Sequence, residues 1–289
     1  MNKILALLAV AILATPLRAE QTKLLVVTTT TGFRHSSIPT LEKVIAQLGK
    51  DSGEFTVDFI QQPPGKPGKL KKNASDAEKA EFKAAEDKWN ASLKTALEKL
   101  SPENLKNYDG VVFASTTGDL PVPDPQGLLE WIKAGHAFIG IHAASDTFHH
   151  WPGYIEMLGG EFHHHGKQVG VECINVDPSN PANAHLGKTW EITQEEIYEF
   201  KNYDSNKVQD LLIMDKNPQT HAPGHFPNSW CKSYGAGKVF YTALGHREDI
   251  IDADPNLKDR VNSVAISKAY EQHVLGGIEW ALGLTKKTD

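Results

Sequence analysis

The stretch Ala137-Phe138-Ile139-Gly140-Ile141-His142-Ala143-Ala144 decides the fold class of this chain. A short apolar run ends abruptly at a histidine, and small residues follow it. Such a run is typical of a strand that is buried on both faces, as in a parallel sheet. The sharp change from strand to helix resembles a nucleophile elbow, but its central residue is His142. The pattern therefore predicts an acid/base group or a metal ligand at this turn, and not a nucleophile.

Similar apolar runs, separated by helical patterns, occur on both sides of this stretch. The other expected strands are Leu24–Thr28, Phe55–Ile60, Val111–Ser115, Val171–Val176, Ile192–Thr193 and Lys238–Ala243. The expected helices include one that follows a capping box at Ser75 and Glu78 and one that closes the chain over Val264–Leu282. Strands that alternate with helices predict an α/β fold with a mostly parallel, doubly wound, flavodoxin-like sheet, in a single domain over residues 20–289.

The ends of the sequence and its composition limit the class of protein. The 289 residues carry a formal net charge of −6, which argues against a nucleic-acid partner. Residues 1–19 read as a signal peptide, with Lys3 before an apolar core and a cleavage site near Ala19. We therefore expect an exported protein, periplasmic or secreted, without membrane insertion. Cys173 and Cys231 could pair after export, although two buried free thiols are favoured.

Polar residues follow several of the expected strands, where ligands collect in an open parallel sheet. Three histidines stand there: His35, His142 and His246. Thr117 and Asp119 follow the strand that begins at Val111. We expect the three histidines and Asp119 to lie around one cleft at the carboxyl edge of the sheet. The alternative is that each histidine only caps a strand, and that His142 is the remnant of a lost active site.

A second group of candidates lies further along the chain. In the run Phe162-His163-His164-His165, neighbouring side chains of an extended segment point to opposite faces, so only His165 is expected at the cleft. Glu196 and Tyr198 share a face if their segment is extended, and a carboxylate beside imidazoles would orient them. The alternative for this segment is a solvated acidic turn.

Two kinds of chemistry remain open for these histidines. The sequence contains neither an HExxH motif nor a cysteine pair at zinc spacing, which favours acid/base chemistry. A catalytic zinc site needs only three protein ligands, however, so a divalent metal such as zinc stays an alternative. Its candidate ligands are His35, His142, His165 and His246.

Longer motifs resemble those of a known family. They are Gly32-Phe33-Arg34-His35, Tyr108-Asp109-Gly110 leading to Thr116-Thr117-Gly118-Asp119, Gly140-Ile141-His142-Ala143-Ala144-Ser145-Asp146, Leu158-Gly159-Gly160-Glu161-Phe162, Glu196-Ile197-Tyr198 and Gly235-Ala236-Gly237 leading to Gly245-His246. In this order they resemble the ThuA-like trehalose-utilisation family, whose fold is that of class I glutamine amidotransferases. The resemblance covers nearly all of the chain after the signal peptide.

The resemblance implies a role in the catabolism of a disaccharide or keto-glycoside. We expect a hydrolase, lyase or isomerase with a small carbohydrate substrate, and a homo-oligomer is among the assemblies that the sequence allows. The catalytic candidates are His142, His35, His246 and Glu196. The substrate-binding candidates are Arg34, Thr117, Asp119, Asp146, His165 and Tyr198.

This sequence also departs from the related patterns. His142 replaces the cysteine at the elbow of the amidotransferases, so glutaminase activity is not expected. Gly166 follows His165, and Asn180 precedes Pro181, where the family often has His-Pro. Both differences lie at the rim of the expected site and affect substrate preference more than the fold. A non-catalytic glycan-binding or scaffold protein is the alternative function.

Overall fold

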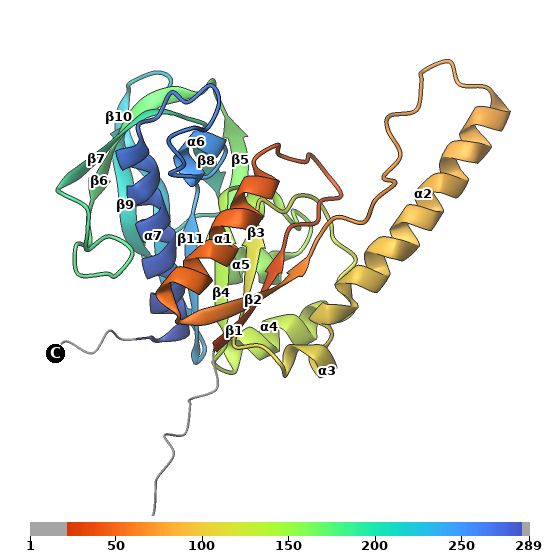
Figure 1. Cartoon of the computed structure of the whole chain (residues 1–289), viewed down its shortest axis with the longest axis horizontal. Coiled ribbons are helices and arrows are strands. Elements are labelled where there is room, and N and C mark those ends of the chain that lie inside the picture. The colour runs from red at the N-terminus through yellow and green to blue at the C-terminus, as the bar shows by residue number, and fades with distance from the viewer. Residues whose placement is uncertain (1–21, 285–289) are drawn as a thin grey trace, which may run out of the picture.

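A nine-stranded sheet forms the centre of the molecule, in the order β2-β1-β3-β4-β11-β10-β9-β6-β7 (Figure 1). The computed structural model describes residues 22–284, so the predicted signal peptide lies outside the described residues. The first five strands of this order run parallel to one another. They are β2 (Phe55–Ile60), β1 (Thr22–Val27), β3 (Gly110–Ala114), β4 (Ala137–Ile141) and β11 (Gly237–Thr242).

The parallel half confirms the α/β fold predicted from the apolar runs. Its order, with the first strand between the second and the third, is that of flavodoxin-like folds. The alternation of side chains in β1 explains why both faces are covered. Leu24 and Val26 pack into one core, whereas Leu25 and Val27 pack into the core on the opposite face.

The other half of the sheet is antiparallel, which the sequence pattern did not predict. It consists of β10 (Pro223–Tyr234), β9 (Gln209–Lys216), β6 (Val169–Asn175) and β7 (Thr189–Glu195). The pairing of β9 with β10 is interrupted by register shifts, and the buried residues of β10 are contiguous and do not alternate. The buried stretch of β10, from Pro227 to Cys231, includes proline, asparagine and serine, so it is neither an apolar run nor an alternating pattern. The sheet is therefore mixed, with a parallel half that is extended by antiparallel strands.

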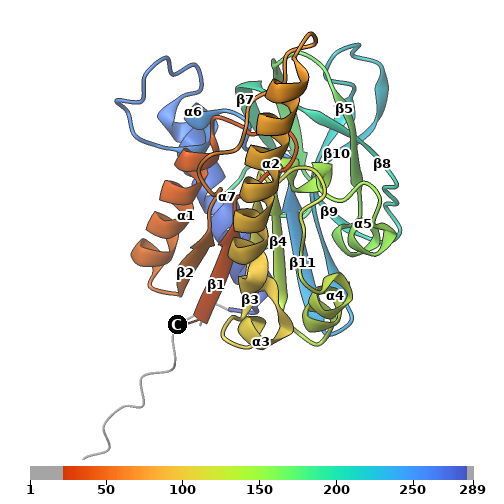
Figure 2. The same ribbon diagram turned by 90° about the vertical axis from the view of Figure 1, so that its right-hand side faces the viewer.

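Helices cover both faces of the sheet (Figure 2). One core contains residues of α1 and α7, and the other contains residues of α4, α5 and the end of α2. A separate two-stranded sheet pairs β5 with β8. The bounds are α1 Ile38–Ser52, α2 Asp76–Leu97, α3 Pro102–Leu105, α4 Pro125–Lys133, α5 Pro152–Leu158, α6 Glu248–Ile251, α7 Val264–Leu282, β5 Glu161–His165 and β8 Tyr198–Lys201, with 3-10 turns η1 at Glu98–Leu100 and η2 at His142–Asp146.

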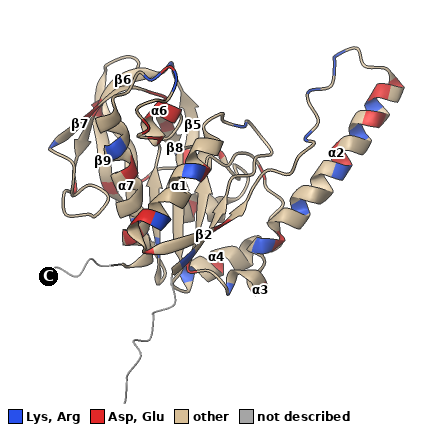
Figure 3. Ribbon diagram, viewed as in Figure 1, with Lys and Arg blue, Asp and Glu red and all other residues tan. Residues whose placement is uncertain are grey.

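Helix α2 projects away from the rest of the molecule (Figure 1). The predicted capping box at Ser75 and Glu78 is confirmed at its start. Only Trp89, Leu93 and Leu97 of the helix are buried, and they lie in its second half. Basic and acidic residues are interspersed along the exposed part of the helix (Figure 3). Opposite charges three or four residues apart stabilise an exposed helix, so this part of α2 is suited to a position in solvent.

Within residues 22–284 we find no helix that is both long and apolar enough to cross a membrane. Cys173 and Cys231 are both buried and free, as the sequence favoured.

Candidate active site

The elbow predicted after β4 is present. Strand β4 ends at Ile141, and His142, the first residue of the turn η2, adopts a left-handed backbone conformation with φ of 50°. The predicted helix that follows is a short 3-10 helix. At Gly140 a Cβ atom would come within 2.9 Å of the Tyr241 ring, so only glycine fits beneath the turn. A non-glycine residue with positive φ stores strain of about 1–2 kcal/mol, which often marks functional sites.

The ring of His142 is fully buried, and its orientation is set by the backbone. Its Nδ1 lies 2.7 Å from the carbonyl oxygen of Ala243. Because a carbonyl oxygen can only accept, Nδ1 carries the hydrogen and donates it. The other nitrogen, Nε2, is then a bare acceptor in the neutral ring, and it is buried without a hydrogen-bond partner among the described residues. Burial lowers the pKa of His142 well below its usual value, so the ring is neutral at neutral pH.

His35 and His246 bring two more rings to the same place. They follow β1 and β11, whose carboxyl ends lie at the same edge of the sheet as that of β4. The ring centroids are separated by 4.8 Å between His35 and His142, by 5.3 Å between His35 and His246, and by 5.4 Å between His142 and His246. Burial, and next the neighbouring His246, lowers the pKa of His35 to about 4. Nδ1 of His35 and Nδ1 of His246 are likewise buried without a hydrogen bond in the part of the chain described.

Glu196, between β7 and β8, completes the group. Its Oε2 lies 3.0 Å from Nδ1 of His246 and 3.7 Å from Nε2 of His142, although neither contact has hydrogen-bond geometry. One donor atom from each of His35, His142, Glu196 and His246 lies within 4.8 Å of the others. We call these four residues the histidine–carboxylate cluster. The structure thus brings Glu196 together with the three predicted histidines, while their catalytic roles stay predictions.

His165 and Tyr198 flank the cluster without belonging to it. His165 is at the end of β5, its side chain is 44% exposed, and its Nδ1 lies 3.1 Å from Oε1 of Glu196. Among the described residues, the group with metal-ligand spacing contains Glu196 and not His165, which corrects the predicted set of metal ligands. The reason is that β5 pairs with β8 outside the main sheet and leaves its end in solvent. Tyr198 is buried, with its ring centroid 4.4 Å from that of His142.

The remaining substrate-binding candidates do not reach the cluster. Asp119 is exposed and lines a separate hollow beside α2, so the expectation that it shares the histidines' cleft is not met. Arg34 donates from Nη1 to the carbonyl oxygen of Thr28, and the buried Thr117 donates to that of Phe33. Both therefore hold loops together. The half-buried Asp146 pairs with Nε2 of His149 at 2.7 Å.

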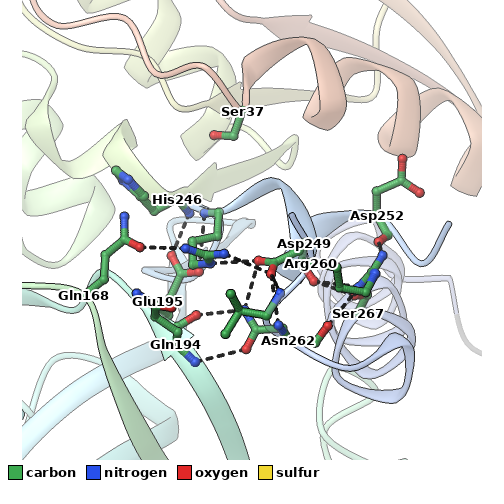
Figure 4. Close-up of polar contacts among 12 residues, drawn as sticks. Ser37, Gln168, Gln194, Glu195, His246, Asp249, Asp252, Arg260, Asn262 and Ser267 are labelled. Atoms are coloured by element: carbon green, nitrogen blue, oxygen red, sulfur yellow. Dashed lines mark hydrogen bonds and ion pairs between the residues drawn. The ribbon is translucent and has the colours of Figure 1, made fainter. Parts of the chain in front are cut away.

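A polar network holds the loop that carries His246 (Figure 4). The buried carboxylate of Glu195 accepts from the backbone N–H of His246 at 2.8 Å and from that of Arg247 at 3.4 Å. Burial raises the pKa of Glu195 to about 8. Asp249 in turn accepts from Nε of Arg247 at 2.8 Å and from the backbone of Asn262 at 2.9 Å. These supporting residues carry no local sequence signal, because their partners are distant in the chain.

One exposed aromatic side chain borders the cluster. Phe33 is 67% exposed, and its ring centroid lies 4.9 Å from that of His35. A hollow of about 290 Å³ is lined among others by Ser36, Gln168 and His246. A larger hollow of about 780 Å³ near α5 includes none of the four cluster residues. Of these two hollows, the larger one therefore does not contain the histidine–carboxylate cluster.

The fold and the site together define an α/β protein with a histidine–carboxylate centre at the carboxyl edge of its parallel strands. The ThuA family, described as trehalose utilisation, matches residues 23–281, and the chain belongs to this family. This confirms the resemblance found in the motifs and associates the chain with carbohydrate metabolism. No curated protein matches the sequence.

Solved structures share the fold. A ThuA-like protein from Parabacteroides merdae is 18% identical with a TM-score of 0.65, and the match covers 93% of each chain. A ThuA-like protein from Bacteroides uniformis is 16% identical with a TM-score of 0.57, covering 95% of this chain and 97% of that one. A β-galactosidase from Rahnella sp. R3 is 12% identical with a TM-score of 0.50, covering 92% of this chain and 32% of that one. At these identities the similarity concerns the fold alone.

Proposed function

We propose that this chain is an enzyme of carbohydrate catabolism that acts on a disaccharide or keto-glycoside at the histidine–carboxylate cluster. One observation carries the proposal. Three buried imidazole nitrogens without hydrogen bonds converge with a carboxylate at the carboxyl edge of the sheet. An unsatisfied buried polar atom costs about 1–3 kcal/mol, so a purely structural role would favour apolar side chains at these positions.

The cluster suits proton transfer on a sugar. Glu196 and His246 are 3.0 Å apart, close enough for the carboxylate to orient the imidazole. In a keto-glycoside, a base removes the proton from the carbon beside the carbonyl, and that electron pair forms a carbon–carbon double bond. The glycosidic C–O bond then breaks, and the leaving alcohol takes up a proton from an acid. A carboxylate beside an imidazole provides both roles.

The substrate class follows from the family and from the rim of the cluster. The family description names trehalose utilisation. Phe33 offers an exposed apolar face beside His35, while the half-exposed His165 beside Glu196 offers a polar group. An apolar face with nearby hydrogen-bonding groups suits a sugar ring, which has both kinds of surface. The substrate-binding roles of Arg34, Thr117, Asp119 and Tyr198 stay predictions.

A turnover screen tests the proposal. The mature protein is incubated with trehalose, other disaccharides and their 3-keto forms, and the products are followed by proton NMR. We expect turnover of at least one substrate, and its loss in Glu196→Gln and His142→Ala. His225→Ala, which removes a surface ion pair with Asp210, is the control that keeps activity. Saturable sugar binding without turnover by the wild type would instead establish the glycan-binding alternative.

We also propose that the enzyme is exported. The support is the arrangement of Lys3, the apolar segment and the cleavage site near Ala19. Expression of the full chain in a bacterial host, followed by fractionation and N-terminal sequencing, tests this. A processed periplasmic or extracellular form that begins near Glu20 is expected, and an unprocessed cytoplasmic form would contradict it.

A further inference from the structure

We propose that His35, His142, His246 and Glu196 bind one divalent transition-metal ion of the zinc class. This inference deepens the proposed function. Metal binding does not depend on that function, and only the catalytic use of the ion rests on it. The sequence pattern favoured acid/base chemistry without a metal, and this inference replaces that preference. The argument proceeds from the positions of the donor atoms, the groups that orient them and the kind of ligand atoms present.

The distances between the donor atoms are close to those in a tetrahedral zinc site. Four ligands of a tetrahedral zinc ion, with zinc–nitrogen distances of 2.0–2.1 Å, lie about 3.4 Å from one another. Oε2 of Glu196 is 3.0 Å from Nδ1 of His246 and 3.7 Å from Nε2 of His142, on either side of this value. All four donors lie within 4.8 Å. Small side-chain rotations are therefore sufficient to close the site around an ion.

The free nitrogens are the second, independent observation. Each of the three imidazoles has one buried nitrogen with no hydrogen bond within residues 22–284, and the three belong to rings that contact one another. Buried donors and acceptors are normally paired with protein or with an ordered water. Three such atoms from three different loops, beside a carboxylate, indicate a shared partner that bonds all of them at once.

The surrounding groups are those that a metal site uses. A histidine ligand almost always donates its other ring N–H to a carbonyl or carboxylate, which fixes the ring and its tautomer. His142 does so, because its Nδ1 donates to the carbonyl of Ala243 and leaves Nε2 bare. Glu195 anchors the backbone of His246, and His165 contacts the second oxygen of Glu196. The ligands are therefore held before any ion arrives.

The ligand set selects the kind of ion. Three imidazoles and one carboxylate favour zinc and its neighbours in the first transition row, whereas magnesium and calcium require oxygen ligands. A bound ion of this kind would act as a Lewis acid or lower the pKa of a bound water. Glu196 can serve as the fourth ligand or, if it moves away, orient that water.

Metal binding is measured directly, without any sugar. The mature chain is prepared without a polyhistidine tag, dialysed against a strong chelator, and titrated calorimetrically with zinc chloride. A parallel titration with cobalt chloride is followed in the visible range, because the intensity of the cobalt bands reports the coordination number. We expect one ion per chain and cobalt bands of four- or five-coordinate geometry. Magnesium and calcium are expected not to compete.

Matched variants locate the ion. His246→Ala and Glu196→Gln should each weaken zinc binding at least tenfold, with folding checked by circular dichroism. The control is the double variant His163→Ala/His164→Ala, which removes exposed histidines of the same run and should bind zinc like the wild type. Loss of binding in the control alone would assign the ion to the surface run and overturn the proposal.

The wild type alone can also refute the site. The absence of zinc binding, or a cobalt spectrum of the hydrated six-coordinate ion, would overturn it even if every variant misfolds. The two proposals fail separately. A protein that binds zinc but converts no sugar contradicts the proposed function only, while sugar turnover by a chelated protein that rebinds no zinc contradicts the metal site only.

Discussion

Replacement of His142 by alanine and by glycine tests the elbow quantitatively. Truncation to alanine removes a fully buried ring, for which a cavity cost of about 2–4 kcal/mol is expected. It leaves the carbonyl of Ala243 without its partner, at about 1–3 kcal/mol, but it also removes the unpaired Nε2, which stabilises by a similar amount. The net loss of about 2–4 kcal/mol is smaller than the total stability of most domains, so we expect His142→Ala to fold.

The comparison with glycine isolates the backbone strain. At an ordinary φ, glycine is less stable than alanine by about 0.5–1 kcal/mol. At the φ of 50° observed for His142, a side chain costs about 1–2 kcal/mol that glycine avoids. We therefore expect His142→Gly to be as stable as His142→Ala or more stable, by up to about 1.5 kcal/mol. Both variants should lose sugar turnover.

Urea denaturation of the two variants, with equal slopes against denaturant, gives the difference directly. If His142→Gly is about 1 kcal/mol less stable than His142→Ala, the elbow is not left-handed and the reasoning fails. Wild-type turnover in either variant would remove His142 from the catalytic group.

Three further predictions concern other parts of the molecule. Phe33→Ala should raise KM for the sugar several-fold with little change in Tm, because this ring is exposed; an unchanged KM would remove Phe33 from the substrate site. Asp249→Ala leaves Arg247 without its partner in the loop that carries His246. It should lower the free energy of unfolding in urea by about 3 kcal/mol and weaken zinc binding, and a decrease below about 1 kcal/mol would contradict this. Burial lowers the pKa of His273 from 6.5 to about 4 in the folded protein. The unfolded chain therefore takes up a proton at His273 more readily below pH 6.5, and the free energy of unfolding falls by up to about 3 kcal/mol as the pH is lowered to 4. In His273→Gln the drop in stability from pH 7 to pH 5 should be smaller by about 2 kcal/mol, and an equal drop would refute the assignment.

Local patterns were sufficient for the parallel half of the fold. The runs at Phe55–Ile60 and Ala137–Ile141 are strands with the predicted bounds, and the closing helix spans Val264–Leu282 as expected. Each of these segments carries an apolar pattern of its own, which can be recognised without knowing its partners in the fold. Strand β10 escaped prediction because its buried stretch from Pro227 to Cys231 includes proline and polar residues, and is neither an apolar run nor an alternating pattern. The apolar residues of β9, Leu211 to Met214, form only a short run, which does not distinguish a strand from a buried helix segment.

The sequence by itself determined which residues stand at the carboxyl ends of the parallel strands, and so it brought His35, His142 and His246 to one edge. This follows from topology, because parallel strands present their carboxyl ends together. Only the tertiary structure decided that Glu196 completes the cluster while Asp119 turns toward α2 and His165 remains at the rim. Those positions depend on the antiparallel half and on the small β5–β8 sheet, whose pairing joins residues far apart in the chain. Long-range pairing of this kind leaves no local periodicity, and only the folded chain shows which side chains it places together.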